Sequence, residues 1–245
     1  MKIRKAVVLA AGRGQRLHPY TLHTPKPMLR LVGMPLLERL LGNLRALGVS
    51  QVLIITGHLE EEIRAYFGRG STLGLELSYR VQQGSPGTGA ALLLAQDFVR
   101  RQPFLSSWGD ALAHLADTQA LVQRFERQPG VAWLLLEKVD DPHRGAAVYL
   151  EGGQVRSLVE KPAPGTSSTC WNPSGVAIYS SAIFSALESL PPSPRGEIEL
   201  TAGVQALVDT GRPVRGLPMQ HPRLHLTSPA DIPQAEALLR ADSTL

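Results

Sequence analysis

The sequence predicts an α/β protein with a Rossmann-like, mostly parallel central sheet flanked by helices. Residues 5–10 and 51–56 are short apolar runs with the length of buried strands, and residues 75–81 alternate as a strand does. Residues 34–47 and 59–67 carry apolar side chains at helical spacing. Strands and helices in this order form right-handed βαβ units and a parallel sheet, whose ligands lie beyond the carboxyl ends of the strands.

At 245 residues, the chain is long enough for one large α/β domain spanning residues 1–245, and two small domains are also possible. Hydrophobic residues make up 43% and charged residues 19%, which excludes a disordered chain. The net charge of +4 would permit binding to nucleic acid, but the basic residues form no runs with interleaved aromatic residues. We therefore expect an anionic small molecule, and no nucleic acid, as the partner.

The single cysteine, Cys170, cannot form an intramolecular disulfide and fits a reducing compartment. No apolar stretch approaches the length of a membrane span. The first residues have the basic start and apolar core of a signal peptide, but the core is short and basic residues follow it at once. We expect a cytoplasmic protein that does not contact a membrane.

A glycine-rich, basic stretch follows the first predicted strand. Gly12 and Gly14 bracket Arg13, and Arg16 and Lys26 follow. Seven Lys or Arg residues and no acidic residue precede Glu38. A glycine turn after a strand exposes backbone N–H groups that favour an anion, and the nearby cations suit a polyphosphate. The stretch therefore predicts a nucleoside triphosphate site; the alternative is a plain turn, which does not explain the spacing of Pro25-Lys26-Pro27.

This stretch, continued through Leu37, resembles the signature of the sugar-1-phosphate nucleotidyltransferases, roughly LAAGxGxRLxPxTxxxPKPMLxxxGxPLL. That family includes glucose-1-phosphate thymidylyl- and uridylyltransferases, mannose-1-phosphate guanylyltransferases and N-acetylmuramate-1-phosphate uridylyltransferase. Gln15 departs from the usual Thr, Ser or Glu. The resemblance implies that Arg16 and Lys26 are catalytic. It also implies that the nucleotide is bound by Leu9, Ala10, Ala11, Gly12 and Gly14.

A second glycine-rich segment, residues 82–90, begins a helix predicted to run to about Arg100. It resembles the family's EQxxPxGTAGA segment, which implies nucleotide binding by Gln82, Gln83, Gly87 and Thr88. A glutamine amide can pair with the edge of a base, and glycine lets the backbone approach the ring. Because Pro86 directly precedes Gly87, the choice between the two glutamines stays open. A helix entry without a ligand is the alternative.

The predicted strand at residues 103–108 ends in Trp108-Gly109-Asp110, although Ser106 and Ser107 make it unusually polar. The ending resembles the family's NGD, whose Asp binds the catalytic Mg²⁺ or another divalent cation. A carboxylate at the carboxyl end of a strand suits such a hard cation. The resemblance thus implies that Asp110 is a catalytic residue and a metal ligand. Taken alone, it would more often be a turn residue.

The second half of the chain predicts a smaller β-rich lobe. A helix at residues 116–128 and a strand at 131–136 complete a nucleotide-binding half of about residues 1–140. From Asp141 onward, short strands at residues 144–150, 154–159 and 176–180 are separated by Gly or Pro. The lobe, and helices at 182–190 and about 197–210 with a strand at 212–217, form a sugar-binding half of about residues 141–245.

Two motifs in this half resemble family segments that bind the sugar phosphate. Glu160-Lys161-Pro162 matches EKP, where Glu holds sugar hydroxyls and Lys reaches the phosphate. Residues 173–176 resemble NAGIY, which implies contacts from Ser174 and Gly175, although Pro173 stands where the family's sugar-binding Asn falls. A solvated loop is the commoner meaning of an isolated EKP.

The C-terminal segment departs from the family at a predicted metal ligand. The family commonly has WxDxGTPEDL, whose first Asp is the second magnesium ligand, and His225 occupies that position here. Histidine can bind a divalent metal, although magnesium prefers oxygen. His225 could also hydrogen-bond a phosphate, or have a structural role alone.

These observations predict an enzyme that condenses an NTP with a sugar-1-phosphate to give an NDP-sugar and pyrophosphate. Two alternatives stay open: a catalytically weak or inactive nucleotide-binding regulatory homologue, and a transferase for a non-sugar phosphorylated alcohol. The nucleobase, the sugar and a homo-oligomeric state are not determined by the sequence.

Overall fold

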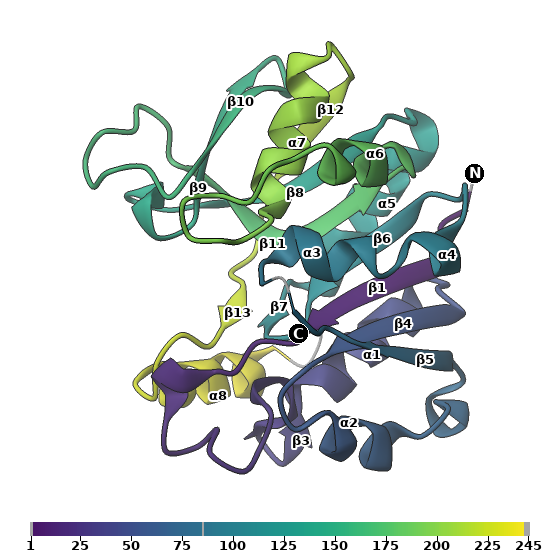
Figure 1. Cartoon of the computed structure of the whole chain (residues 1–245). Helices are drawn as coiled ribbons and strands as arrows, with labels where there is room; N and C mark the ends of the chain where they lie inside the picture. The colour runs from purple at the N-terminus through teal and green to yellow at the C-terminus, as the bar shows by residue number, and fades with distance from the viewer. Residues whose placement is uncertain (1, 85, 243–245) are drawn as a thin grey trace.

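The computed structural model describes residues 2–84 and 86–242. Ser85, which falls in the predicted base-binding segment, and the last residues of the predicted domain lie outside the described residues. The described strands form one large mixed sheet and two small ones (Figure 1). In spatial order, the large sheet contains β5 (Glu76–Val81), β4 (Gln51–Thr56), β1 (Lys5–Ala10), β6 (Phe104–Trp108), β11 (Trp171–Tyr179), β8 (Ala132–Lys138), β12 (Val214–Pro218), β10 (Gln154–Glu160) and β9 (Ala146–Glu151).

The large sheet is mostly parallel, which confirms the predicted fold class. β1 pairs in parallel with both β4 and β6, β4 pairs in parallel with β5, and β12 pairs in parallel with β8. β11 runs antiparallel to β6 and β8, and β10 runs antiparallel to β12 and β9. The strands of the β-rich lobe therefore extend the same sheet.

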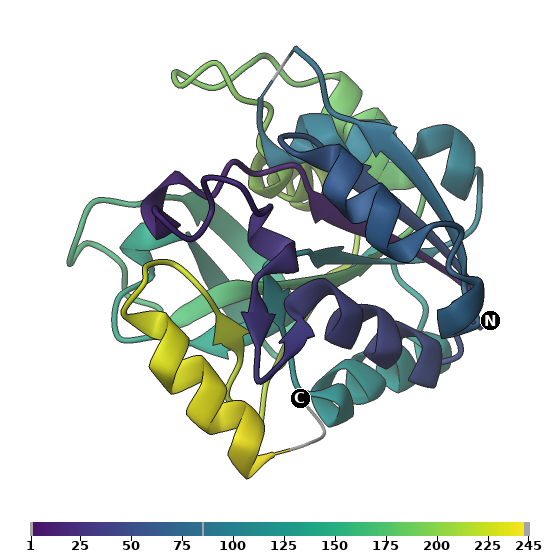
Figure 2. The ribbon, with the colours of Figure 1, turned by 90° about the horizontal axis from the view of Figure 1, so that it is seen from below.

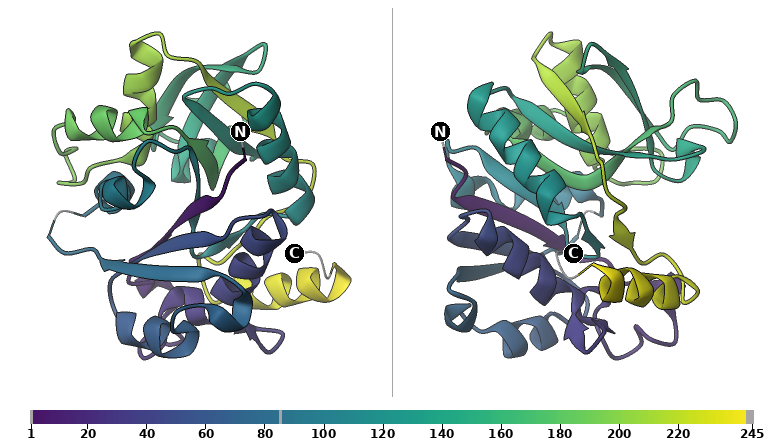
Figure 3. Two further views of the ribbon diagram at one scale, coloured as in Figure 1. Left: turned by 90° about the vertical axis from the view of Figure 1, so that its right-hand side faces the viewer. Right: turned by 180° about the vertical axis from the view of Figure 1, so that it is seen from behind.

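Helices cover both faces of this sheet, as Figure 3 shows for green α6 and α7 on one side and α1 and α2 on the other. One face packs against α1 (Leu36–Ala46), α2 (Glu60–Phe67), α5 (Leu115–Arg127) and α8 (Asp231–Ala241). The opposite face packs against α3 (Thr88–Leu93), α4 (Gln96–Val99), α6 (Ala182–Glu188) and α7 (Leu200–Asp209). Alternate residues of β1 enter the two cores, because successive strand side chains point to opposite faces.

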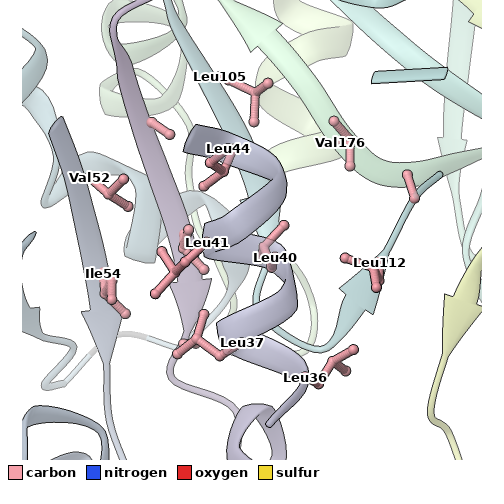
Figure 4. Packing of buried hydrophobic residues seen from close by; sticks show 14 of the residues in the cluster. Leu36, Leu37, Leu40, Leu41, Leu44, Val52, Ile54, Leu105, Leu112 and Val176 are labelled. Atoms are coloured by element: carbon pink, nitrogen blue, oxygen red, sulfur yellow. The ribbon is translucent and has the colours of Figure 1, made fainter. Parts of the chain in front are cut away.

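Helix α1 shows how the apolar pattern becomes a packed layer. Its leucines recur at helical spacing and are buried, and Figure 4 shows Leu37, Leu41 and Leu44 packed with Val52 and Ile54 of β4. Gly48 follows the helix with a φ of 84°, a backbone conformation that glycine adopts at little cost.

Short elements complete the edge of the sheet where the strands of the first half end. The 3-10 helices η1 (Gln15–Leu17) and η2 (Lys26–Met28) follow β1, and a hairpin of β2 (Arg30–Leu31) and β3 (Met34–Pro35) follows them. Helix α8 packs beside this hairpin, as the view from below shows (Figure 2). β7 (Ala111–Leu112) pairs with β13 (Leu224–His225). The remaining 3-10 helices are η3 (Ser71–Leu73) and η4 (Pro142–Arg144).

Two details of the predicted elements were wrong. The helix predicted to run to about Arg100 is two helices. Between α3 and α4, the N–H groups of Leu94 and Ala95 donate hydrogen bonds to the carbonyls three residues earlier, as in a 3-10 helix, and this tightens the chain. The strand predicted at residues 176–180 begins at Trp171 instead. Its first part was not predicted because Pro173 and Gly175 disfavour a strand, and its pairing with β8 is irregular there.

We expect Leu41→Ala to lower the free energy of unfolding by about 2–5 kcal/mol, because Leu41 is fully buried in the layer between α1 and the sheet. Leu22→Ala is the matched control: 48% of Leu22 is exposed, so its truncation should change stability by less than about 0.5 kcal/mol. Urea unfolding followed by circular dichroism measures both. Equal effects of the two substitutions would contradict this packing.

Candidate functional site

The glycine turn after β1 lies between the ends of two parallel neighbours. β1 ends at Ala10, which pairs with Thr56 of β4, and Leu9 pairs with Trp108 of β6. The backbone N–H of Gly109 donates to the carbonyl of Leu9 at 2.8 Å. The turn and the segment after β6 are therefore held side by side at the carboxyl edge of the sheet.

The turn leaves backbone donors free. Within the described part of the chain, the N–H groups of Gly12, Arg13 and Gly14 donate no hydrogen bond. The carbonyl of Gly14, by contrast, accepts from the N–H of Leu17 and the hydroxyl of Thr21, each at 2.8 Å. Consecutive free N–H groups beside exposed Arg13 form an arrangement that favours an anion.

Lys26 lies directly beside this turn. Gly14 has a φ of 65°, and a Cβ added to it would lie 3.1 Å from the Cβ of Lys26. Lys26 is only 8% exposed, and its ammonium group forms an ion pair with the carboxylate of Asp110. The structure thus brings together Gly14, Lys26 and Asp110, while Arg16 is exposed in η1 and forms no ion pair with a described residue.

The surroundings of Asp110 favour its charged form. Partial burial by itself would raise the pKa of this carboxyl group. The neighbouring His225 and Lys26 outweigh burial, so the pKa of Asp110 lies well below its usual range. Asp110 is therefore a carboxylate at neutral pH and can bind a cation.

His225 reaches the same carboxylate from the C-terminal segment. It lies on β13, opposite Ala111, so the pairing of β13 with β7 carries it to the residue that follows Asp110. Its Nε2 atom is 3.8 Å from Oδ2 of Asp110. Among the described residues, no group of three or more His, Cys, Asp or Glu side chains is arranged to hold a metal ion. The pair would need oxygen ligands from a substrate to complete a coordination sphere.

The segment predicted to bind the base packs closely on the backbone of Ile198. A Cβ on Gly87 would lie 2.4 Å from the carbonyl oxygen of Ile198, and the N–H of Gly89 donates to that oxygen at 2.8 Å. Thr88 accepts a hydrogen bond from the N–H of Leu200 at 3.3 Å. These contacts require the glycine at position 87 whether or not a ligand is bound.

The two glutamines of this segment differ in their surroundings. The amide of Gln82 donates to the carbonyl of Gly87 at 3.1 Å, while Gln83 is exposed. Gln82 thus braces the loop, and Gln83 is open to solvent.

Glu160 and Lys161 end β10, and an arginine that the sequence analysis did not single out joins them. Arg195 forms ion pairs with Glu160 at 3.3 Å, with Glu197 at 3.6 Å and with Glu199. Burial and the neighbouring Glu199 raise the pKa of Glu197. Lys161 is exposed and has a φ of 42°. Arg195 lies in a turn, where no local pattern indicated that it would meet β10.

Ser174 and Gly175 lie on β11, where Gly175 packs against Trp108 and Ser174 is fully buried. Gly175 has a φ of 90°, and a Cβ there would lie 2.5 Å from the indole ring of Trp108. Arg223, only 6% exposed as a side chain, donates to the carbonyl of Ser174 and to Glu137, each at 2.6 Å. This buried arginine was also missed, because its partners lie far away in the sequence.

Asn172, which directly precedes Pro173, bonds the backbone at the start of β9. Its Oδ1 atom accepts a hydrogen bond from the N–H of Ala146 at 2.9 Å. A Cβ on Gly145 would lie 2.2 Å from the same oxygen, so Asn172 fastens the start of β9.

Comparison with known proteins now assigns the chain to a family. A family model described as nucleotidyl transferase matches residues 5–223. The chain belongs to this nucleotidyl transferase family. The match confirms the family resemblance that the glycine turn and the later motifs indicated.

Three relatives illustrate the membership. The chain is 37% identical to a glucose-1-phosphate thymidylyltransferase of Streptomyces griseus over 86% of its length, and 30% identical to the UTP–glucose-1-phosphate uridylyltransferase AglF of Haloferax volcanii over 98%. It spans 59% of the first relative and 98% of the second. A crystal structure of UDP-glucose pyrophosphorylase with UDP-glucose, 22% identical, has the same fold at a TM-score of 0.85, with 98% of this chain and 99% of that chain covered.

We expect Gly14→Ala to lower the free energy of unfolding by about 1–2 kcal/mol, because its left-handed backbone disfavours a side chain and the added Cβ would press on Lys26 and Thr21. Gly12→Ala is the matched control, since nothing lies within 4 Å of a Cβ at that position. Thermal unfolding of both variants tests this. The expectation fails if Gly12→Ala is the more destabilising substitution.

Proposed function

We propose that the protein joins an NTP to a sugar-1-phosphate, giving an NDP-sugar and pyrophosphate. The observation that carries the proposal is the row of free N–H groups at Gly12 to Gly14 beside the Lys26–Asp110 pair. Family membership and the names of the relatives, thymidylyl- and uridylyltransferases of glucose-1-phosphate, support it.

In the proposed reaction, an oxygen of the sugar phosphate attacks the α-phosphorus of the NTP. The bond from the α-phosphorus to the bridging oxygen breaks, and pyrophosphate leaves. The turn at Gly12 to Gly14, with Leu9, Ala10 and Ala11 leading into it, would bind the triphosphate together with Arg16. Lys26 would offset charge on the α-phosphoryl group. Such a displacement depends on positioning and charge neutralisation.

The residues present fit a divalent cation that arrives with the nucleotide. Asp110 would hold it, with His225 as a second ligand or as a donor to phosphate. Magnesium is commonly bound by one or two carboxylates plus substrate phosphates, which matches a site with a single carboxylate. The cation would supply positive charge to the triphosphate. Mg²⁺ itself is a proposal, because histidine suits other divalent metals better.

The remaining predicted residues would bind the two substrates. Gln83, Gly87 and Thr88 would bind the base, while Gln82 would act by bracing the loop, since it bonds the carbonyl of Gly87. Glu160, oriented by Arg195, would accept hydrogen bonds from sugar hydroxyls, and Lys161 would reach the sugar phosphate. The backbone at Ser174 and Gly175 would line the sugar site.

The absent carboxylate at position 225 favours one second candidate, a module that binds nucleotide without turnover.

None of the helices in residues 2–84 and 86–242 is long and apolar enough to cross a membrane. A cytoplasmic location and a homo-oligomeric state stay predictions.

We expect Lys26→Ala and Asp110→Ala each to lower kcat by about 10²–10³-fold, the scale of losing one preorganised electrostatic contact. Pyrophosphate release across the four common NTPs with several sugar phosphates measures this. Lys2→Ala and Asp97→Ala are matched controls, since both residues are exposed and lie away from the turn. Wild-type turnover in the Lys26 or Asp110 variant would reject these roles. Tight nucleotide binding by the wild-type protein without pyrophosphate release would favour the binding module.

We expect His225→Asp to lower the Mg²⁺ concentration needed for half-maximal activity, because it places a second carboxylate beside Asp110. The change should be smaller with Mn²⁺, which accepts imidazole more readily. Titration of both metals at saturating substrates measures it. An unchanged Mg²⁺ requirement would show that position 225 does not contribute to binding the cation.

A further inference from the structure

The segment that carries His225 crosses the molecule between two parts of the fold. It runs from β12, in the part of the sheet that holds β8, through β13 to α8, which lies beside the β2–β3 hairpin (Figures 1 and 3). The pairing of β13 with β7 covers two residues, Leu224 opposite Leu112 and His225 opposite Ala111. Such a short ladder is shorter than most strands and gives little support by itself. Other contacts must therefore help to set the position of His225.

The side chains around β13 alternate between the core and the site. Leu224 and Leu226 are buried in the same hydrophobic core as the leucines of α1. Neighbouring residues of an extended segment point to opposite sides. Arg223 and His225 therefore extend from the other side of this segment, where His225 meets Asp110.

Arg223 fastens the segment to two strands of the large sheet. Its side chain is buried, and its two terminal nitrogens donate to the carbonyl of Ser174 on β11 and to the carboxylate of Glu137 on β8, each at 2.6 Å. The register between β11 and β8 shifts between Pro173 and Ala177, so Ser174 lies where the ladder is interrupted. The guanidinium group thus supplies a hydrogen bond at the irregular part of β11.

Stability alone does not account for this buried arginine. Its Nε atom is buried and has no hydrogen-bond partner among the described residues. An unpaired buried donor and the removal of two charges from water both cost free energy, and well-packed apolar side chains often replace such a pair without loss of stability. A guanidinium group, however, holds two partners in a fixed geometry, which an apolar side chain does not. The contribution of the pair is therefore position.

We propose that Arg223 and Glu137 form a positioning pair that holds His225 against Asp110. The pair anchors residue 223 on β8 and β11, and the step of two residues to His225 then fixes where the imidazole lies. Arg223 itself does not touch the substrates. This assignment rests on the proposed function, in which His225 binds the cation or a phosphate, and adds the residues that place it there.

The test replaces both members of the pair, because removal of one would leave a charge without its partner. Arg223→Met/Glu137→Met (the paired Met variant) should raise the Mg²⁺ or Mn²⁺ concentration needed for half-maximal pyrophosphate release by about tenfold, the scale of losing a group that orients a metal ligand. Arg223→Lys should keep only part of the function, because an ammonium group lacks two separate donor ends. An unchanged metal requirement in the paired Met variant would overturn the proposal.

Arg156→Met is the matched control. Arg156 forms a comparable ion pair with Glu151, at 2.7 Å, but both side chains are exposed and belong to β10 and β9. The same substitution there should leave the metal requirement unchanged. An equal effect of Arg156→Met would show that the loss is not specific to Arg223 and would contradict the proposal.

A His225→Ala background separates positioning from a general structural role. If Arg223 and Glu137 act through His225, adding their two substitutions to His225→Ala should change kcat and the metal requirement by less than about twofold. Losses that multiply in the combined variant would overturn the proposal. Thermal unfolding of each variant is measured beside the wild-type protein, and a paired Met variant that does not fold would show that the pair serves the fold and would also overturn it.

The position of His225 can also be measured without turnover. Its ring centroid lies 6.3 Å from that of Trp108, so the NMR resonances of the labelled imidazole, assigned by their loss in His225→Asn, depend on this aromatic neighbour. In the paired Met variant they should move toward those of exposed His23, and Arg156→Met should leave them in place. Unchanged His225 resonances in the paired Met variant would overturn the proposal. If no pair of substrates releases pyrophosphate, the proposed function fails, and these resonances alone decide whether the pair positions His225.

Discussion

The ion pair between Lys26 and Asp110 is the interaction on which the arrangement of the site depends. A lysine that is only 8% exposed would be costly without a charged partner. The partner is available because β1 and β6 are neighbours in parallel and end at the same edge. The pair joins the segment that follows the glycine turn to the end of β6. The ammonium group of Lys26 is thereby held next to the backbone N–H groups of the glycine turn, and both would stabilise an anion bound there.

The opposite side of the site is held together by two arginines. Arg195 neutralises a group of carboxylates that would otherwise repel one another, and so fixes Glu160 at the end of β10. Arg223, two residues before His225, joins Glu137 of β8 to the backbone of Ser174. Each arginine uses several donors in a fixed geometry, which suits it to bracing loops that have little regular structure.

Much of the fold could be predicted because its signals are local. Buried strands such as residues 51–56 are short apolar runs, and the leucines of α1 recur at helical spacing. The two wrong details, the length of the helix after Thr88 and the start of β11, share a cause. The turn within the first segment and the irregular start of the second have no periodic pattern. The two-residue strands β7 and β13 could not be found either, because their pairing joins residues more than a hundred positions apart.

For the site, the sequence by itself determined the chemical groups: a glycine turn with Lys26, a strand ending in Asp110, and histidine where a second carboxylate is usual. Only the tertiary structure decided what those groups touch. It set His225 beside Asp110 and engaged Asn172 with the start of β9. The reason is physical: periodicity reports which face of an element is apolar, whereas a contact between distant segments depends on how whole layers pack.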